Sequence, residues 1–276
     1  MTTPPVLIAQ ISDLHIKPPG QKAYGRVDTA AALSRCVTHL LALRPRPDLV
    51  VISGDLVDGG TDEEYAHLHE LLAPLDLPYA AVPGNHDARE PMRRAFPSLS
   101  YAQESGALNQ RHTVRGLELL LLDSSVPGAP HGLLDTATLS WLDRTLADGN
   151  LPALLFLHHP PFRTGIWHMD RQNLHNADAL AEIVRRHPRV RHIAAGHVHR
   201  ATVAQFAGLP ATICPAPNHA VALDLAELIA PSFTVDPPAF HLHAWFPDEN
   251  SLVTHFVPIG EFDGPHPFFD ASGNLL

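Results

Sequence analysis

Short apolar runs alternate with amphipathic stretches through the first 200 residues of the chain. Short apolar runs bounded by turn residues predict buried strands, here at residues 6–11, 49–53, 79–82, 117–122, 153–157 and 191–195. Apolar positions at helical spacing predict helices between many of these runs, at residues 28–43, 62–73, 136–147 and 177–187. Alternation of strands and helices favours an α/β core.

The last quarter of the chain has a different pattern. After residue 200 the helical period fades, and short β-like runs follow at residues 201–206, 210–214, 219–224, 239–246 and 251–257. No linker sets this part off, so we expect residues 1–276 to form a single domain. In it, residues 200–276 complete a second sheet and provide an oligomer contact or a lid. Alternating His241, His243 and Trp245 predict one strand face, which we interpret as sheet surface or a subunit contact.

Composition narrows the classes of partner. Apolar residues make up 45% of the 276 residues, enough for a sizeable core. With 17% charged residues and a net charge of −10, binding to a nucleic-acid duplex is not expected, because a phosphate backbone needs a basic surface. No apolar run reaches the length of a membrane span or a signal peptide, so we expect a cytoplasmic protein with no membrane partner.

Polar side chains follow five of the predicted strands directly. In chain order they are Asp13 and His15, Asp55, Asn85, His158, and finally His197 with His199. Ligands of open α/β sheets bind outside the carboxyl ends of the strands. Residues two apart at a strand end project to the same side, so each pair is expected to face one cavity. Five such strand ends together predict a single shared site.

The types of these side chains indicate a metal centre. Aspartate oxygens with imidazole nitrogens, and no cysteine, suit Zn, Mn or Fe better than a soft thiolate site does. Seven ligands are too many for one tetrahedral ion and match two ions that share a bridging carboxylate. Two ions about 3.5–4 Å apart are the arrangement that clamps a phosphoryl group during its transfer.

The same residues resemble the sequence blocks of the calcineurin-like metallophosphoesterases. The blocks are Asp13-x-His15, Gly54-Asp55-x-x-Asp58, Gly84-Asn85-His86-Asp87, His158-His159 and Gly196-His197-x-His199. Finer features resemble the bacterial class III cyclic-nucleotide phosphodiesterases and related glycerophosphodiesterases: Tyr24-Gly-Arg-Val-Asp28, His158-His-Pro-Pro-Phe162 and His168-Met-Asp-Arg171.

The resemblance implies a fold and a ligand set. It implies a four-layer αββα sandwich with two mixed sheets flanked by helices. It assigns one metal to Asp13, His15, Asp55 and His199. It assigns the other to Asp55, Asn85, His158 and His197, with Asp55 as the bridge.

We expect a hydrolase that cleaves small phosphodiesters, either cyclic nucleotides such as 3',5'-cAMP or glycerophosphodiesters, by in-line attack of a hydroxide held between the metals. His86 is expected to contact a phosphate oxygen or to act as general acid, with Asp58 holding its imidazolium; a turn residue is the other reading of Asp58. Asn85, Tyr24 and His168 are the further candidates for substrate contact. Gly59 stands where related protein phosphatases carry an arginine for a dianionic monoester, which favours diesters.

Two alternatives stay open. One is a metal-dependent phosphomonoesterase or nucleotidase. The other is a non-catalytic scaffold that keeps the fold for protein binding, although such scaffolds typically lose metal ligands and every block ligand is present here. The expected partners are a small phosphodiester and further copies of the chain, in a dimer or a higher homo-oligomer.

Overall fold

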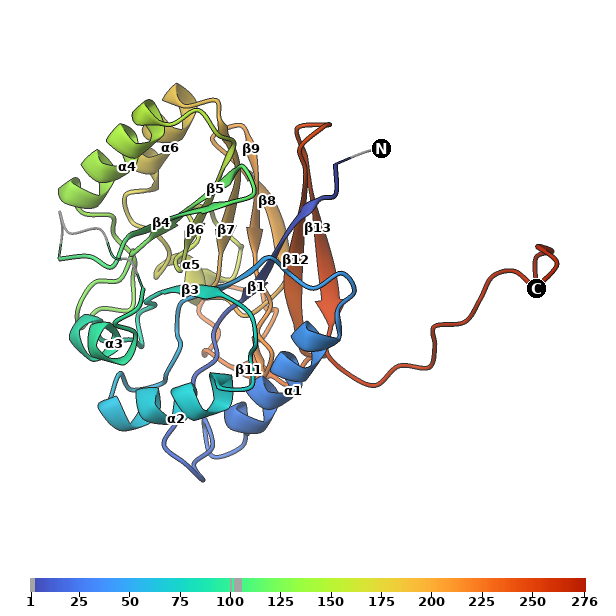
Figure 1. Cartoon of the computed structure of the whole chain (residues 1–276). Helices are drawn as coiled ribbons and strands as arrows, with labels where there is room; N and C mark the ends of the chain where they lie inside the picture. The colour runs from blue at the N-terminus through green and yellow to red at the C-terminus, as the bar shows by residue number, and fades with distance from the viewer. Residues whose placement is uncertain (1–2, 100, 102–105) are drawn as a thin grey trace.

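The computed structural model describes residues 3–99, 101 and 106–276. Two β-sheets lie face to face, and helices cover the outer face of each (Figure 1). The predicted four-layer αββα sandwich is therefore confirmed.

The first sheet has five strands in the order β13-β12-β1-β2-β3. Its parallel part is β1 (Val6–Ile11), β2 (Leu49–Ser53) and β3 (Tyr79–Val82). Antiparallel β12 (Ala239–Phe246) pairs with the free edge of β1, and β13 (Ser251–Pro258) pairs with β12. Helices α1 (Thr29–Ala42), α2 (Asp62–Leu72) and α3 (Arg89–Ala95) pack on its outer face through apolar residues such as Leu33, Leu68 and Met92.

The second sheet has six strands in the order β4-β5-β6-β7-β9-β8. Parallel β5 (Leu117–Leu122), β6 (Ala153–Leu157), β7 (Val190–Ala195) and β9 (Leu209–Ile213) form its centre, and antiparallel β4 (Gln110–Val114) and β8 (Thr202–Phe206) form its edges. Helices α4 (Thr136–Asp148) and α6 (Ala177–Arg186) cover its outer face. The smaller elements are α5 (Trp167–Asp170), β10 (Ala220–Val221) and β11 (Phe233–Thr234).

Local sequence signals place the element ends. The side chain of Asp28 caps α1 by accepting from the backbone N–H of Ala31. Thr61 and Glu64 form a reciprocal capping box at the start of α2. The apolar runs become strands because inward-facing residues such as Ile8, Val51 and Phe156 form a core cluster between the two sheets. All six predicted strands and all four predicted helices are confirmed, with ends that differ by a residue or two.

The last quarter of the chain departs from the prediction that it completes the second sheet. The structure divides it between both sheets, because β8 and β9 extend the second sheet while β12 and β13 extend the first. The reason lies in the crossover through α1, which carries the chain from β1 to its parallel neighbour β2 and leaves the other edge of β1 open for β12. No helix in the described ranges is both apolar enough and long enough to cross a membrane.

The interpretation of His241 and His243 as sheet surface or a subunit contact is wrong. Both side chains are buried, on the face of β12 that also carries buried Trp245. His243 donates from Nε2 to Gln10 Oε1 at 3.1 Å, and its Nδ1 accepts from Thr254 Oγ1 at 2.8 Å. Strand alternation predicts which residues share a face, but not that the second sheet covers this face.

Buried imidazoles between the sheets should make the fold sensitive to acid. Burial lowers the pKa of His192 and of His241 from 6.5 to about 4. As pH falls from about 6.5 to about 4, the unfolded chain takes up protons that the folded chain does not. The free energy of unfolding therefore falls in this window, by about 1.4 kcal/mol per pH unit for each such histidine.

In His241→Leu, the free energy of unfolding should fall less steeply as the pH is lowered, by about 1.4 kcal/mol per pH unit. Urea denaturation at several pH values between about 4 and 6.5 measures this slope. The comparison between variants cancels the contributions of all other groups. His266→Leu is the control, because the side chain of His266 is 69% exposed. An unchanged slope in the His241 variant would show that this imidazole takes up its proton equally in both states.

Candidate metal centre

The carboxyl ends of five parallel strands meet at one edge of the sandwich. From the first sheet, β1 leads to Asp13 and His15, β2 leads to Asp55, and β3 leads to Asn85. From the second sheet, β6 leads to His158 and β7 leads to His197 and His199. The predicted convergence is thus present, with the carboxylates and the amide on one sheet and most of the imidazoles on the other.

The backbone at five of these seven residues is left-handed. The φ angles are positive at Asp13, His15, Asp55, His197 and His199, at 57°, 47°, 50°, 74° and 57°. The members of each pair therefore face the cavity through tight turns beyond the strand, and not through strand alternation as the sequence suggests. Non-glycine residues adopt this region at an energetic cost, and such strain clusters at functional sites where the surrounding structure enforces it.

Two glycines allow the strand ends to approach each other. A Cβ atom at Gly84 would lie 2.2 Å from Asp55 Oδ1, and one at Gly196 would lie 2.1 Å from Ser12 Oγ. Contacts this short are impossible, so any larger residue would displace the carboxylate or the loop that holds it.

A first group of side chains that could hold an ion consists of Asp13, His15, Asp55 and His199, all buried, with ligand atoms within 4.8 Å of one another. His199 Nε2 lies 3.3 Å from Asp13 Oδ1. His15 Nε2 lies 3.5 Å from Asp55 Oδ2 and 3.2 Å from His199 Nε2. Two carboxylates and two imidazoles that point at one place form a donor set typical of a divalent cation.

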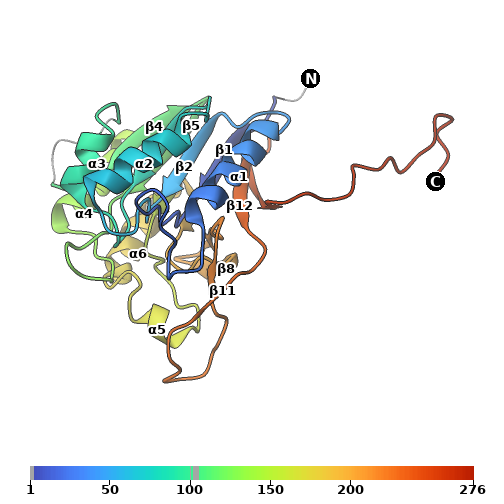
Figure 2. The same ribbon diagram turned by 90° about the horizontal axis from the view of Figure 1, so that it is seen from below.

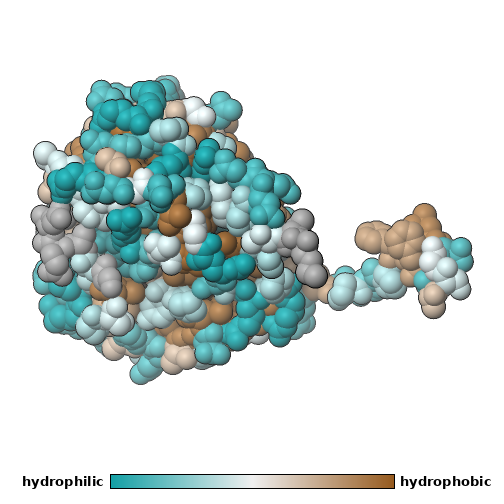
Figure 3. Space-filling model, turned by 45° about the horizontal axis from the view of Figure 1, so that its top comes forward, coloured by the Kyte–Doolittle hydropathy of each residue, from teal (hydrophilic) through white to brown (hydrophobic). Residues whose placement is uncertain are grey.

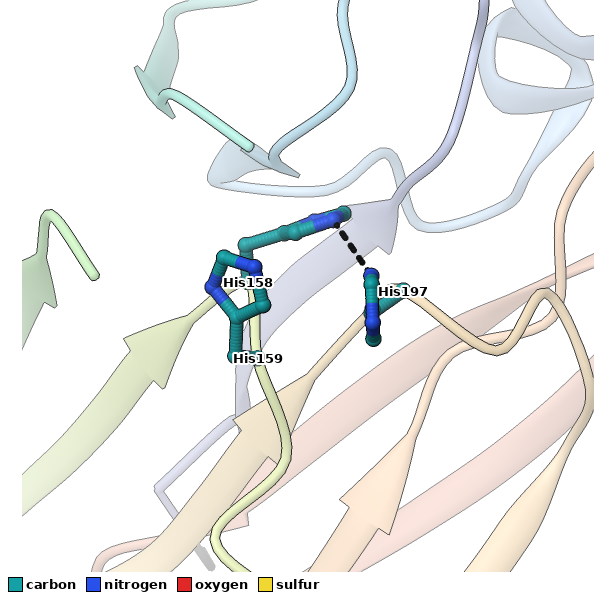
Figure 4. Close-up of side chains that lie close together, drawn as sticks. All are labelled: His158, His159 and His197. Atoms are coloured by element: carbon teal, nitrogen blue, oxygen red, sulfur yellow. Dashed lines mark hydrogen bonds between the residues drawn. The ribbon is translucent and has the colours of Figure 1, made fainter. Parts of the chain in front are cut away.

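A second group adjoins the first through Asp55. His158 Nε2 lies 3.3 Å from Asp55 Oδ2, and His197 Nδ1 lies 3.3 Å from His158 Nε2 (Figure 4). Asn85 Oδ1 is buried, and among the residues that the structure describes it has no hydrogen-bond partner. An unpaired buried carbonyl oxygen is costly, and a cation would satisfy it. Asp55 Oδ2 lies within 3.5 Å of an imidazole nitrogen of each group, as the bridging assignment requires.

Hydrogen bonds fix the orientation of three of the imidazoles. His158 Nδ1 donates to the backbone oxygen of Ser53 at 2.9 Å, and His199 Nδ1 donates to that of His219 at 3.3 Å. His15 Nδ1 donates to Asp58 Oδ1 at 3.1 Å. In each ring the other nitrogen, Nε2, is left as a lone-pair donor facing the centre, which is how outer hydrogen bonds set the tautomer of metal ligands.

The pKa shifts of the buried carboxylates and imidazoles in the centre favour binding of a cation. Burial raises the pKa of Asp13 to about 6, and the neighbouring Asp55 adds to this rise. Burial also opposes ionisation of Asp55, but the surrounding imidazoles, His158 first, outweigh it and hold the pKa of Asp55 well below its usual range. Burial lowers the pKa of His197 and of His199 well below the usual value, which keeps these rings neutral and able to bind a metal. The residues present therefore fit a cation-binding centre.

The predicted pairing of Asp58 with His86 differs in the atoms involved. His86 Nδ1 donates to the backbone oxygen of Asp58 at 2.8 Å, whereas the Asp58 carboxylate lies 3.9 Å away from it. That carboxylate instead accepts from His15 and, at 2.6 Å, from Lys17 Nζ. These two hydrogen bonds hold the pKa of Asp58 well below its usual value. Residues 17–26 were a candidate substrate loop, but this contact of Lys17 was not predicted, and it draws the carboxylate toward His15.

An outer cavity of about 420 Å³ opens onto the centre. All four residues predicted to contact substrate line it: Tyr24, Asn85, His86 and His168. The ring of Tyr24 stacks on that of Phe233 at a centroid distance of 4.9 Å. Sequence reasoning missed Phe233, which reaches the cavity from the two-residue strand β11, in a part of the sequence that carries no strand or helix signal.

Sequence reasoning also missed Asn218 and His219. Asn218 Nδ2 donates to the backbone oxygens of Asp13 and Leu14, and the ring of His219 lies 4.5 Å from that of His199. Both residues follow β9, which runs parallel to β7 and ends at the same edge. Polar residues after a further predicted strand, at 210–214, were the signal that could have found them.

Comparisons with known proteins agree with this site. Residues 6–201 match the sequence model of the calcineurin-like phosphoesterase family. A probable glycerophosphodiester phosphodiesterase of Arcobacter nitrofigilis is 38% identical over 98% of this chain and 100% of its own length. A 3',5'-cyclic adenosine monophosphate phosphodiesterase of Pseudomonas aeruginosa is 36% identical over 71% of this chain and 70% of its own. A dimetal phosphatase from Danio rerio shares the fold, with a TM-score of 0.70 at 16% identity over 94% of this chain and 98% of that one.

The position of the Asp58 carboxylate yields a prediction about metal affinity. In Asp58→Asn, His15 loses the acceptor that fixes its tautomer, and the dissociation constant for Mn or Zn should rise about 10–100-fold. Titration of the metal-free protein with the ion, followed by calorimetry, measures this. The matched variant Asp28→Asn changes a carboxylate that caps α1, and its metal affinity should not change. Unaltered affinity with slowed turnover in Asp58→Asn would instead support a role for this carboxylate at His86.

Proposed function

Because the chain belongs to the calcineurin-like phosphoesterases, we propose that it is a metal-dependent phosphodiesterase that hydrolyses small phosphodiesters. The observation that carries this proposal is the meeting of two groups of potential metal ligands at the Asp55 carboxylate. The relatives named for glycerophosphodiesters and for cyclic AMP support these two substrate classes.

Two ions, of Mn, Fe or Zn, suit the mixed oxygen and nitrogen donors. One would be held by Asp13, His15, Asp55 and His199, and the other by Asp55, Asn85, His158 and His197. When bound, such ions supply Lewis-acid stabilisation of phosphoryl oxygens and lower the pKa of water at the site.

The chain's own residues place and protonate the substrate. His86 lines the cavity beside Asn85, and its Nδ1 is occupied by the backbone oxygen of Asp58. Its Nε2 is thus the atom available to a substrate. In the protonated ring, Nε2–H can donate to a phosphate oxygen and then pass its proton to the departing alcohol. The backbone N–H of His86 donates to Asp55 Oδ1 at 2.9 Å, which ties the position of His86 to the centre.

The wall of the outer cavity favours diesters over monoesters. Beyond the potential metal ligands and His86, its lining consists of neutral and aromatic residues, among them Tyr24, Met169, Gln172 and Phe233, with no lysine or arginine in the described lining. Beyond His86, a monoester dianion would meet no lysine or arginine on this wall. A diester carries one charge, which would face the metals when they are bound, and its second alcohol group can rest on the apolar and aromatic part of the wall.

A substrate panel tests this function. Purified protein supplied with Mn should hydrolyse bis-p-nitrophenyl phosphate with a higher kcat/KM than p-nitrophenyl phosphate, because only the diester presents a monoanion with a second organic group. It should also hydrolyse a glycerophosphodiester or 3',5'-cAMP, and a chelator should abolish both activities. A preference for the monoester would indicate a phosphomonoesterase or nucleotidase, and lack of both metal and activity would indicate a non-catalytic scaffold.

The role of His86 has its own test. His86→Ala should lower kcat by about 10²–10⁴-fold, the usual contribution of a general acid, while the metal content stays unchanged. His168→Ala, on the outer wall, is the matched variant and should change KM more than kcat. Loss of metal from the His86 variant would show that His86 holds an ion, as its closeness to His15 and Asp58 also allows.

A further inference from the structure

The C-terminal segment, residues 261–276, extends from the end of β13 away from the rest of the molecule (Figures 1 and 2). We call it the arm. All of its residues are exposed. Within the described part of the chain, no hydrogen bond or ion pair joins the arm to the body of the protein. Residues that fold without packing on their own chain are available to another molecule.

The tip of the arm, residues 268–276, is an ordered knob. Phe269 and Leu275 form a β-bridge, and Asp270 closes the turn by accepting from the backbone N–H groups of Ser272 and Asn274. The knob exposes Phe268, Phe269, Leu275 and Leu276, at 78%, 58%, 74% and 77%, and forms an apolar cluster in the space-filling view (Figure 3). Exposed apolar clusters of this kind mark interaction sites.

The stem that carries the knob holds it away from its own body. Residues 261–267 include Pro265 and Pro267, which restrict the backbone and favour an extended stem. At about 3.1 Å per residue, the stem spans at most roughly 22 Å. An apolar knob on an extended stem is suited to a surface on another molecule.

A suitable surface lies near the root of the arm. A cavity of about 280 Å³ is lined largely by apolar residues, which are Ala201, Pro215, Ala216, Ala220, Pro237 and Phe256. We call it the root groove. Phe256 is 51% exposed and lies on β13, two residues before the strand ends and the chain leads into the arm. β13 is also an edge strand of eight residues without an acidic or basic residue other than His255. Proteins usually protect such edges with charges, prolines or a covering element.

We propose that the knob of one copy of the chain docks in the root groove of a second copy. The arm starts beside the groove, so a two-fold axis near this face would exchange two arms reciprocally, each knob entering the other copy's groove. Such self-complementary contacts are what a two-fold dimer requires. The docked knob would cover Phe256 and the edge of β13, and the groove would cover the four apolar residues of the knob.

The docked knob would also lie against the metal centre. The root groove shares His199 and His219 with the outer cavity, so the partner's knob would back these two rings. The effect of the knob on the metal centre rests on the proposed function, whereas the docking of the knob does not. The experiments that test the docking therefore measure association of two chains and not activity.

The first test is the mass of the protein in solution. The full chain of 30.0 kDa should sediment as a dimer, at twice this mass, and a chain that lacks residues 261–276 should sediment as a monomer. Phe256→Ser, in the groove, should raise the dimer dissociation constant at least tenfold, as loss of a buried aromatic anchor does. Val203→Ser is the matched control, because Val203 is 82% exposed on β8, the edge strand of the other sheet, and should have no effect. A full chain that stays monomeric, or a dimer that survives removal of the arm, overturns the proposal.

The second test separates exchange between copies from folding back of the arm. Ser272→Cys places a thiol on the knob, and Ala201→Cys places one at the groove, while native Cys36 and Cys214 are buried and unreactive. A short bis-maleimide should join the two variants when they are mixed, in a product of two chains. Joining only within a chain that carries both substitutions would show that the arm covers its own groove, and no joining would show that the knob binds elsewhere.

Discussion

The structure depends on keeping the carboxylates of Asp13 and Asp55 charged in a place that solvent does not reach. Burying one isolated charged carboxylate costs much free energy, and burying two close together costs more because they also repel each other. Backbone N–H groups meet part of this cost, because His197 donates to Asp13 and His86 donates to Asp55. Imidazoles around Asp55 meet a further part. The remaining negative charge would be neutralised by two bound metal ions. The two buried carboxylates, which destabilise the fold without metal, are therefore the groups that would hold the metals.

Neither sheet can build this centre alone. The first sheet brings both carboxylates and the amide of Asn85, and the second brings His158, His197 and His199. The two edges are held in register by the apolar cluster between the sheets, in which Ile8 and Val51 face Phe156. Gln10 adds a polar connection through this layer, since it donates both to Ser53 Oγ and to the backbone oxygen of Ala195. A rigid sandwich is what keeps the turns after β1, β2 and β7 in a left-handed backbone conformation that no local preference would select.

The sequence predicted the strands and the residues at their ends well, because both follow from local patterns. A buried strand needs an apolar run, and a parallel strand presents its next residues at a known edge. Features set by distant residues were not predictable. The carboxylate of Asp58 turns to His15 because Lys17 lies on that side, and His241 and His243 are buried because the second sheet covers their face of β12. The positions of His219, in a loop, and of Phe233, on the short strand β11, likewise depend on the completed fold.

The fold constrains the potential metal ligands more strongly than it constrains the residues of the outer cavity wall and the arm. Every potential metal ligand lies within residues 6–201, the part that matches the family. His219 in a loop, Phe233 on the short strand β11, and the arm all come after it. Loops on a rigid scaffold can change without disturbing the core that supports them. Relatives named for glycerophosphodiesters and for cyclic AMP, similar to this chain over 98% and 71% of its length, fit such a division. The two sheets fix the positions of the potential metal ligands. In the proposed function the later segments, and in the proposed dimer the partner's knob, would shape the wall that receives the second alcohol group of a substrate.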